Sequence, residues 1–205
     1  MPGRQDGAMR LFVAVNPPAA ALQELVDAAA PLHELPGADR LRWSEVAGWH
    51  LTLAFLGEVP AAEVPRLEPL LARVAEEHGA HRLRLAGGGT FGDRVLWAGV
   101  AGEVWALRRL AEGVRAVLPE LGIESDQHGF HPHLTLARAG SSHGQRRAER
   151  RSAVGDLHAM AGALEEFRGA EWEAAELHLM LSETGFGPSR YRSLSSWPLA
   201  RWEAG

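Results

Sequence analysis

Apolar residues recur along the chain with two different spacings, and these spacings predict strands and helices that alternate from end to end. Short apolar runs and two-residue alternation predict strands at residues 10–15, 41–44, 49–56, 81–85, 94–100, 133–137, 174–182 and 191–199. Apolar residues spaced three and four apart predict helices at residues 19–32, 61–77, 104–117 and 147–160. Glycine-rich stretches at residues 87–89 and 184–188 predict turns between strands.

The order of these elements predicts an α+β fold. Several neighbouring strands are too close in sequence for a crossover helix between them, so they are expected to pair antiparallel. No linker or low-complexity tract divides residues 10–205, which we expect to form a single domain. Residues 1–9 are expected to be a flexible tail.

Composition removes several kinds of chemistry. The chain has 205 residues, no cysteine and 21 basic residues that are all arginine, against 26 acidic ones, for a net charge of −5. Disulfides, thiolate nucleophiles, zinc–cysteine sites, Schiff bases and a P-loop lysine are therefore excluded. No apolar run approaches the length of a membrane-spanning helix, and residues 1–9 lack the apolar core of a signal peptide, so we expect a cytoplasmic protein that binds no membrane.

One tetrapeptide, His-Leu-Thr-Leu, occurs twice, at residues 50–53 and 133–136. In a strand, alternate side chains share a face, so the histidine and the threonine of each copy point one way and the leucines point into the core. Two such strands would offer two imidazoles and two hydroxyls to one cleft. A neutral imidazole can take a proton from water while a protonated one gives a proton to a leaving oxygen, and hydroxyls can bind the charged oxygens between them. This set suits displacement at phosphorus.

The two motifs and their flanks resemble the 2H phosphoesterase superfamily, specifically the RNA 2′,3′-cyclic phosphodiesterases that are also called 2′-5′ RNA ligases. The resemblance rests on residues 49–57 and 130–138, the opening strand at 10–15, and residues 177–182 followed by Tyr191. It implies two pseudo-symmetric lobes with mostly antiparallel sheets around a central cleft and helices on the outside. It also implies that no cofactor is used and that the partners are RNA ends or nucleotides with a 2′,3′-cyclic phosphate. We expect the protein to act as a monomer.

The resemblance further assigns roles to the motif residues. His50 is expected to be the proton donor and His133 the proton acceptor in the hydrolysis of the cyclic phosphate to a 2′-phosphate, with Thr52 and Thr135 holding the phosphoryl oxygens. The symmetry of the site means that chemistry alone does not say which histidine is the acid. Reversible 2′-5′ ligation is a secondary expectation, and it must be independent of ATP because no lysine can form an adenylate.

Two other functions stay open. One is a related enzyme that opens a small cyclic phosphate such as ADP-ribose 1″,2″-cyclic phosphate. The other is a nucleotide-binding module that uses the same cleft without turnover.

Two arginines are candidates for substrate binding. Arg138 lies five positions after His133 and would face away from it in an unbroken strand, so we expect it to act on a phosphate or on the terminal base from the strand's end. Arg42 can reach RNA from the strand before the first motif. Phe55 and Phe130 are expected to pack in the core rather than stack on a base.

Two further clusters carry weaker hypotheses. Asp126, His128, His131 and His133 suggest a metal site, but their spacing matches no ligand set and we expect no metal. Four arginines at helical spacing form a charged patch that can guide an RNA backbone or simply face solvent: Arg146, Arg147, Arg150 and Arg151.

Overall fold

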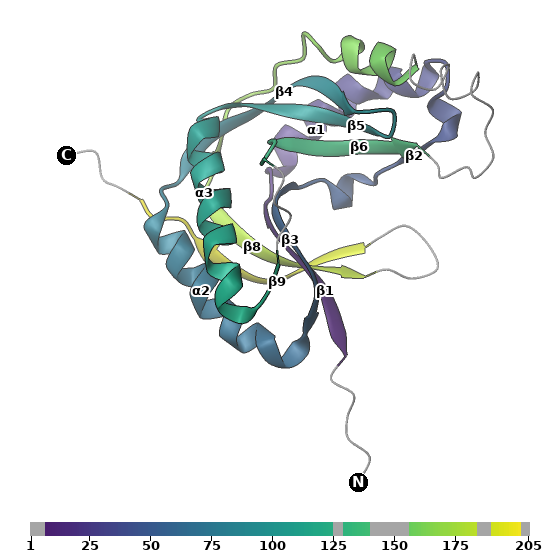
Figure 1. Cartoon of the computed structure of the whole chain (residues 1–205). Coiled ribbons are helices and arrows are strands. Elements are labelled where there is room, and N and C mark those ends of the chain that lie inside the picture. Colours follow the sequence, from purple (N-terminus) through teal and green to yellow (C-terminus); the bar gives the residue numbers. More distant parts are fainter. Residues whose placement is uncertain (1–6, 125–128, 140–155, 184–189, 202–205) are drawn as a thin grey trace.

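Two antiparallel sheets form the centre of the molecule. The structure is a computed structural model, and it describes residues 7–124, 129–139, 156–183 and 190–201. Sheet A has the strand order β3-β1-β8-β9 and sheet B the order β2-β6-β5-β4-β7 (Figure 1). The strands of sheet A are β1 (Ala8–Val15), β3 (Leu51–Pro60), β8 (Glu176–Glu183) and β9 (Arg190–Pro198). Those of sheet B are β2 (Leu41–Trp43), β4 (His81–Phe91), β5 (Val95–Gly102), β6 (His133–Ala139) and β7 (Trp172–Ala174).

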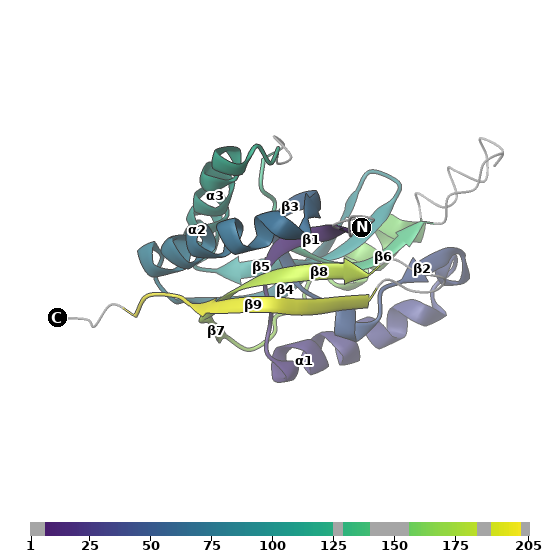
Figure 2. The same ribbon diagram turned by 90° about the horizontal axis from the view of Figure 1, so that it is seen from below.

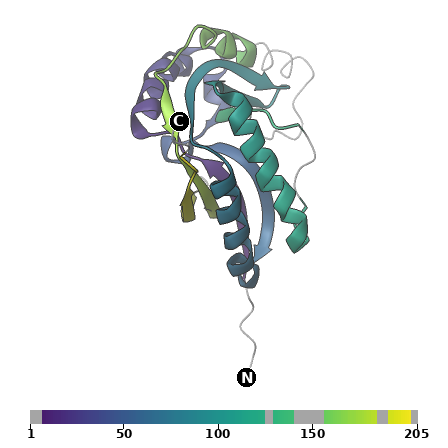
Figure 3. The same ribbon diagram turned by 90° about the vertical axis from the view of Figure 1, so that its left-hand side faces the viewer.

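Helices cover the outer sides of the sheets. Helices α2 (Val64–Glu77) and α3 (Val104–Val117) lie next to each other along one side of the molecule (Figures 1 and 3). Helix α1 (Ala19–Ala29) lies on another side, away from both (Figure 2). Residues 156–163 are also helical. Short 3₁₀ turns occupy Ala30–Glu34, Ala38–Arg40, Val46–Gly48, Ala61–Glu63 and Leu118–Leu121.

The apolar stripes read from the sequence are the buried faces of these helices. In α2 the buried residues Leu67, Leu71 and Val74 follow one another at intervals of four and three, as one face of an α-helix requires. Leu107, Leu110 and Val114 do the same in α3. Their side chains join those of both sheets in one continuous core cluster.

The predicted α+β class and the antiparallel pairing are confirmed, with small shifts of boundaries. Every pairing between the named strands is antiparallel. The helix expected at 19–32 leaves the α conformation after Ala29, where a 3₁₀ turn with Pro31 follows. Of the helix expected at 147–160, residues 147–155 lie outside the described part.

The chain does not divide into two lobes by sequence halves. Strand β1 pairs with β8 near the other end of the chain, and β2 pairs with β6. Each sheet therefore takes strands from both halves, and the two copies of the repeated tetrapeptide fall in different sheets.

The turn expected at Gly87–Gly89 is wrong, because these residues continue strand β4. Their lack of side chains serves close packing. A Cβ atom on Gly89 would lie 2.2 Å from the Trp97 ring of β5, and one on Gly88 would lie 2.7 Å from Leu164. The second expected glycine turn, 184–188, lies outside the described residues.

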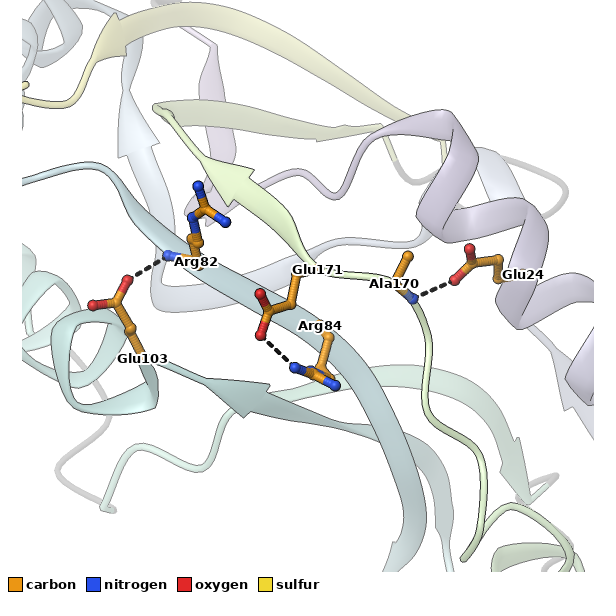
Figure 4. Close-up of polar contacts among 6 residues, drawn as sticks. All are labelled: Glu24, Arg82, Arg84, Glu103, Ala170 and Glu171. Carbon is orange, nitrogen blue, oxygen red and sulfur yellow. Dashed lines mark hydrogen bonds and ion pairs between the residues drawn. The ribbon is translucent and has the colours of Figure 1, made fainter.

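Polar contacts along β4 connect sheet B to its surroundings (Figure 4). Arg84 forms an ion pair with Glu171, and the backbone N–H of Arg82 donates to Glu103 at 2.7 Å. The backbone N–H of Ala170 donates to Glu24 of α1, also at 2.7 Å. These contacts join β4 to the start of α3 and to the segment before β7, and that segment is in turn joined to α1.

Candidate active site

A pocket of about 520 Å³ lies between the two sheets and contains both copies of the repeated motif. Sheet A contributes most of the lining, and the rest comes from strand β6 of sheet B and from the segment between β2 and β3. The lining residues are Arg10, Leu11, Phe12, Ser44, Gly48, His50, Thr52, Phe55, Gly57, His133, Thr135, Arg138, Ser182 and Tyr191. The structure therefore brings His50, Thr52, His133 and Thr135 together in one pocket, and Arg138 lies there as well.

The same irregularity occurs in both motif strands. The two sequences are identical over five residues, since Ala54 and Ala137 follow the tetrapeptides. Leu53 has no partner in the register of β3 with β1, and Leu136 has none in the register of β6 with β5. Each second leucine is thus the extra residue of a β-bulge, which reverses the alternation of side chains beyond it.

These bulges explain how Arg138 enters the pocket. In a regular strand it would face away from His133, and the expectation that it acts from the strand's end was based on that geometry. The bulge at Leu136 instead turns Arg138 to the face of His133 and Thr135, within β6 itself. Phe55 holds the same place on β3, five residues after His50.

The surroundings of His50 are aromatic. Its ring lies 4.6 Å from that of Phe12 and 5.0 Å from that of Tyr191, centroid to centroid. The residue stands just before β3, which begins at Leu51 rather than at the expected residue 49. The backbone of Gly48, two residues earlier, hydrogen-bonds the ring. A Cβ on Gly48 would lie 3.0 Å from the Tyr191 ring, so the absence of a side chain there admits the tyrosine.

The surroundings of His133 follow the same plan. Its Nδ1 donates to the carbonyl oxygen of His131, again two residues earlier, at 2.7 Å. The ring of Phe91 meets it edge-on at 4.7 Å, and Trp97 lies at 6.4 Å. Because Nδ1 donates to the backbone, the neutral imidazole presents Nε2 as a proton acceptor.

Burial makes both imidazoles weaker bases than free histidine. Burial, assisted by the charge of His133, lowers the pKa of His50 from 6.5 to about 4, against a smaller opposing effect of the Gly48 backbone. Burial also lowers the pKa of His133, and the charges of His131 and Arg138 act in the same direction. At neutral pH both rings are therefore neutral in the unliganded protein.

The pocket is rich in unused hydrogen-bond donors. Within the described residues, no protein hydrogen bond or ion pair engages the hydroxyls of Ser44, Thr52, Thr135, Ser182 and Tyr191 or the guanidinium groups of Arg10 and Arg138. No described carboxylate lines the pocket. An acidic protein thus presents a locally positive, donor-rich surface, which suits a phosphate.

Arg42 lies beside this pocket rather than in its lining. It stands directly opposite Arg138 in the pairing of β2 with β6, so the two side chains leave the same face of sheet B. Like charges directly opposite each other destabilise a sheet, and an anion between them would remove that repulsion.

The expectation for Phe55 is wrong. Its side chain is 57% exposed and lines the pocket, because the bulge at Leu53 turns it away from the core. Phe130 does pack against the core, and the Arg115 guanidinium lies 5.8 Å from its ring centroid.

The sequence pattern did not identify Arg10 and Ser182 as site residues. Arg10 is the one charged residue of β1 and stands between Met9 and Leu11. The sequence of β1 therefore shows no row of polar residues that would mark Arg10 as part of a site. Only the pairing of β1 with β3 and β8 shows that this face of the strand looks into the pocket.

Two expectations involve residues that the structure does not describe. Asp126 and His128 of the suggested metal cluster lie there, as do all four arginines of the charged patch at 146–151. Among the described residues, no group of three or more His, Asp or Glu side chains comes together as a metal site. Nor does any helix in the described ranges have the length and apolarity to cross a membrane.

Comparison with known proteins points to one family. A model of the 2′-5′ RNA ligase superfamily matches residues 17–185. The chain is 40% identical to an RNA 2′,3′-cyclic phosphodiesterase of Geobacillus stearothermophilus over 100 residues, which are 47% of this chain and 32% of that protein. It is 38% identical to an RNA 2′,3′-cyclic phosphodiesterase of Thermus thermophilus over 141 residues, 63% of this chain and 68% of that one. The fold is similar to that of Escherichia coli LigT complexed with 3′-AMP, with a TM-score of 0.73 and 26% identity over 95% of this chain and 99% of that chain.

Proposed function

Because this chain belongs to the 2′-5′ RNA ligase superfamily, we propose that it hydrolyses 2′,3′-cyclic phosphate ends of RNA to 2′-phosphate ends by acid–base catalysis with two histidines. The observation that carries the proposal is the meeting of both His-x-Thr motifs, from two different sheets, in one pocket without a described carboxylate. The names of the relatives support this substrate class, and the similar LigT structure holds a nucleotide, 3′-AMP.

The reaction divides the two protons between the two imidazoles. His133 takes a proton from a water molecule as the water oxygen forms a bond to phosphorus. His50 gives a proton to the departing 3′ oxygen as the bond between phosphorus and that oxygen breaks. The products are a 2′-phosphate and a free 3′ hydroxyl. Proton exchange with solvent then restores both histidines.

The hydroxyls and arginines of the pocket suit the charge that develops at phosphorus. Thr52 and Thr135 donate hydrogen bonds to the non-bridging oxygens from opposite sides, one from each motif strand. Arg138 adds a positive charge next to His133. The exposed ring of Phe55 offers a surface on which the terminal base can stack.

The lowered pKa of His50 is compatible with its role as the acid. A cyclic phosphate is an anion, and a bound anion favours the charged form of a nearby imidazole. Substrate binding therefore raises the pKa of His50 and charges it at the moment when a proton is needed. In this scheme no step requires a metal ion.

Ligation follows from the same chemistry with one change of nucleophile. If the 5′ hydroxyl of a second RNA takes the place of water, the bond to the 3′ oxygen still breaks and a 2′-5′ phosphodiester forms. No ATP is consumed, in keeping with a chain that contains no lysine to be adenylated.

The experiment is hydrolysis of an oligonucleotide that ends in a 2′,3′-cyclic phosphate, in the presence of a chelator, followed by mapping of the product phosphate. The wild type should give a 2′-phosphate. His50→Ala and His133→Ala should each lower kcat/KM by about 10²–10⁴. His178→Ala removes a half-buried histidine outside the pocket and should keep the wild-type rate. A 3′-phosphate product, or normal rates in both pocket variants, would contradict the proposal.

A sulfur atom in place of the 3′ bridging oxygen separates the two roles. A thiolate is a weaker base than an alkoxide and leaves without a proton. The sulfur substrate should therefore restore much of the activity of His50→Ala but not that of His133→Ala; the opposite pattern would exchange the two roles. Turnover of ADP-ribose 1″,2″-cyclic phosphate but not of the oligonucleotide would favour the small-substrate enzyme, and binding without turnover would favour the nucleotide-binding module.

A further inference from the structure

Arg10 is a cation in the pocket that the proposed reaction does not use. It lies on β1 of sheet A, whereas the motif strand β6 belongs to sheet B. Arg10 and Phe12 share one face of the strand because they are two residues apart, and both line the pocket. The Phe12 ring contacts His50 at 4.6 Å, and Arg10 stands two residues away from Phe12, about 7 Å further along the strand.

The Ser182 hydroxyl lies next to Arg10 on the neighbouring strand β8. Leu11 pairs with Leu181 in the register of β1 with β8, which makes Ser182 the neighbour of Arg10 at the next position. Ser182 in turn stands opposite Tyr191 of β9. Arg10, Ser182 and Tyr191 thus form a row across three strands at the side of the pocket that lies away from β6.

Within the described residues, no carboxylate forms an ion pair with Arg10. Glu58 stands opposite it on β3, yet no ion pair joins the two in the described part of the chain. A guanidinium and a hydroxyl without protein partners, held side by side on rigid strands, form a binding site for an anionic oxygen. In the proposed reaction the two imidazoles, the two threonines and Arg138 already serve the reacting phosphate.

We propose that Arg10 and Ser182 bind the phosphate on the 5′ oxygen of the terminal nucleotide, so that the site distinguishes an RNA end from a bare nucleoside cyclic phosphate. The inference rests on the proposed function for the identity of the substrate. The 5′ oxygen projects from the ribose away from its 2′,3′ edge, as Arg10 is displaced along β1 from the side chain that contacts His50. The phosphate can belong to the internucleotide link or to a free 5′ end, since both offer the same anionic oxygens.

Kinetics on three substrates tests the inference: adenosine 2′,3′-cyclic phosphate, the same nucleotide with a 5′-phosphate, and the dinucleotide ApA with a terminal cyclic phosphate. The wild type should turn over the last two with a kcat/KM at least tenfold higher than the first. Arg10→Gln should lower kcat/KM for those two by about tenfold to a hundredfold, the range of a hydrogen bond to a charged group. Its effect on the first substrate should be at least fivefold smaller.

Arg192→Gln is the matched control, because Arg192 follows Tyr191 on β9 but does not line the pocket. It should preserve the ratio between substrates. An equal loss on all three substrates in Arg10→Gln would overturn the inference, since Arg10 would then act on the reacting phosphate or on the fold. A wild type that does not distinguish the substrates would overturn it as well.

Binding of product analogues tests the inference without turnover. Adenosine 2′,5′-bisphosphate should bind the wild type at least tenfold more tightly than adenosine 2′-monophosphate, and Arg10→Gln should abolish that difference. If the wild type hydrolyses no cyclic phosphate but shows this difference, the proposed function fails and the phosphate site stands. If hydrolysis is normal and the difference is absent, only the phosphate site fails.

Discussion

The two histidines of the site have identical local sequences but different surroundings. Each has its ring held by the backbone two residues earlier and each is bordered by aromatic rings. Burial is the main cause of the lowered pKa at both rings: it lowers the pKa of His50 to about 4, and at His133 the charges of His131 and Arg138 add to the effect of burial. The repeat therefore supplies two similar imidazoles, and the residues around each one determine how far its pKa is lowered.

These pKa shifts predict the pH dependence of kcat/KM. The reaction needs one protonated and one neutral imidazole, and both pKa values of the free protein lie below 6.5. The singly protonated pair is therefore most abundant on the acid side of pH 6.5, and its concentration falls at higher pH as the last imidazole proton is lost. A profile measured from pH 4 to pH 8 should be bell-shaped with its maximum below pH 6.5.

Arg138 offers a directional control for that profile. Its positive charge lowers the pKa of His133, so Arg138→Gln should move the alkaline limb to higher pH in addition to weakening substrate binding. A maximum above pH 7 in the wild type, or an alkaline limb that does not move in the variant, would contradict the assignment of that limb to the buried imidazoles.

At the scale of elements, the sequence predicted the motif strands but not their bulges. Period-two alternation correctly placed His50 with Thr52 and His133 with Thr135 on shared faces. It failed five residues beyond each histidine, for Phe55 and Arg138, because the unpaired Leu53 and Leu136 shift the alternation in their strands. A bulge depends on the partner strand, which the local sequence does not specify.

The glycines of β4 give a prediction about the packing behind His133. Gly89 leaves room for the Trp97 ring, and a Cβ there would lie 2.2 Å from it. Trp97 packs against His131, whose carbonyl orients His133. Gly89→Ala should displace the indole, reduce the free energy of unfolding by about 1–3 kcal/mol and lower kcat.

Gly162→Ala is a suitable control for this packing. Gly162 lies in the helical stretch 156–163, and a Cβ there would meet nothing within 4 Å. Alanine at that position should leave kcat unchanged and increase stability by about 0.5–1 kcal/mol, because alanine favours a helix over glycine. Urea denaturation and steady-state kinetics of both variants make the comparison; equal stability of the two variants would show that Trp97 does not need the space.

At the scale of the whole molecule, the sequence predicted the class and the antiparallel pairing but not which strands are neighbours. The pairing of β1 with β8 and of β2 with β6 joins segments far apart in the chain. Those pairings place Arg10 and Ser182 at the pocket and put Arg42 beside Arg138. The local sequence was enough to predict the two repeated His-Leu-Thr-Leu motifs as site residues. The residues around them became apparent only from the long-range strand pairings.

The burial of histidines also has a consequence for the stability of the whole fold. Burial lowers the pKa of His50, His81, His131, His133 and His178 below 6.5. Below pH 6.5 the unfolded chain binds protons at these positions that the folded protein does not bind until lower pH. The free energy of unfolding should therefore be highest above pH 6.5 and should fall as the pH decreases.

His50 allows this effect to be measured at one residue. The pKa of His50 is about 4 in the folded protein and 6.5 in the unfolded chain. Lowering the pH from 7.5 to 5.0 should therefore reduce the free energy of unfolding by roughly 2 kcal/mol through this residue, since a difference of one pKa unit corresponds to about 1.4 kcal/mol. His50→Gln removes the titrating group, so its free energy of unfolding should fall by roughly 2 kcal/mol less than that of the wild type over this interval. Thr52→Val alters the same pocket without changing a titrating group, and its free energy of unfolding should depend on pH as that of the wild type does.

Urea denaturation at the two pH values decides between these outcomes. If the free energy of unfolding of His50→Gln changes with pH as much as that of the wild type, the imidazole of His50 does not resist protonation in the folded protein. The residue proposed to deliver the proton would then be charged before substrate arrives, and the substrate-induced rise of its pKa would have no part in the reaction.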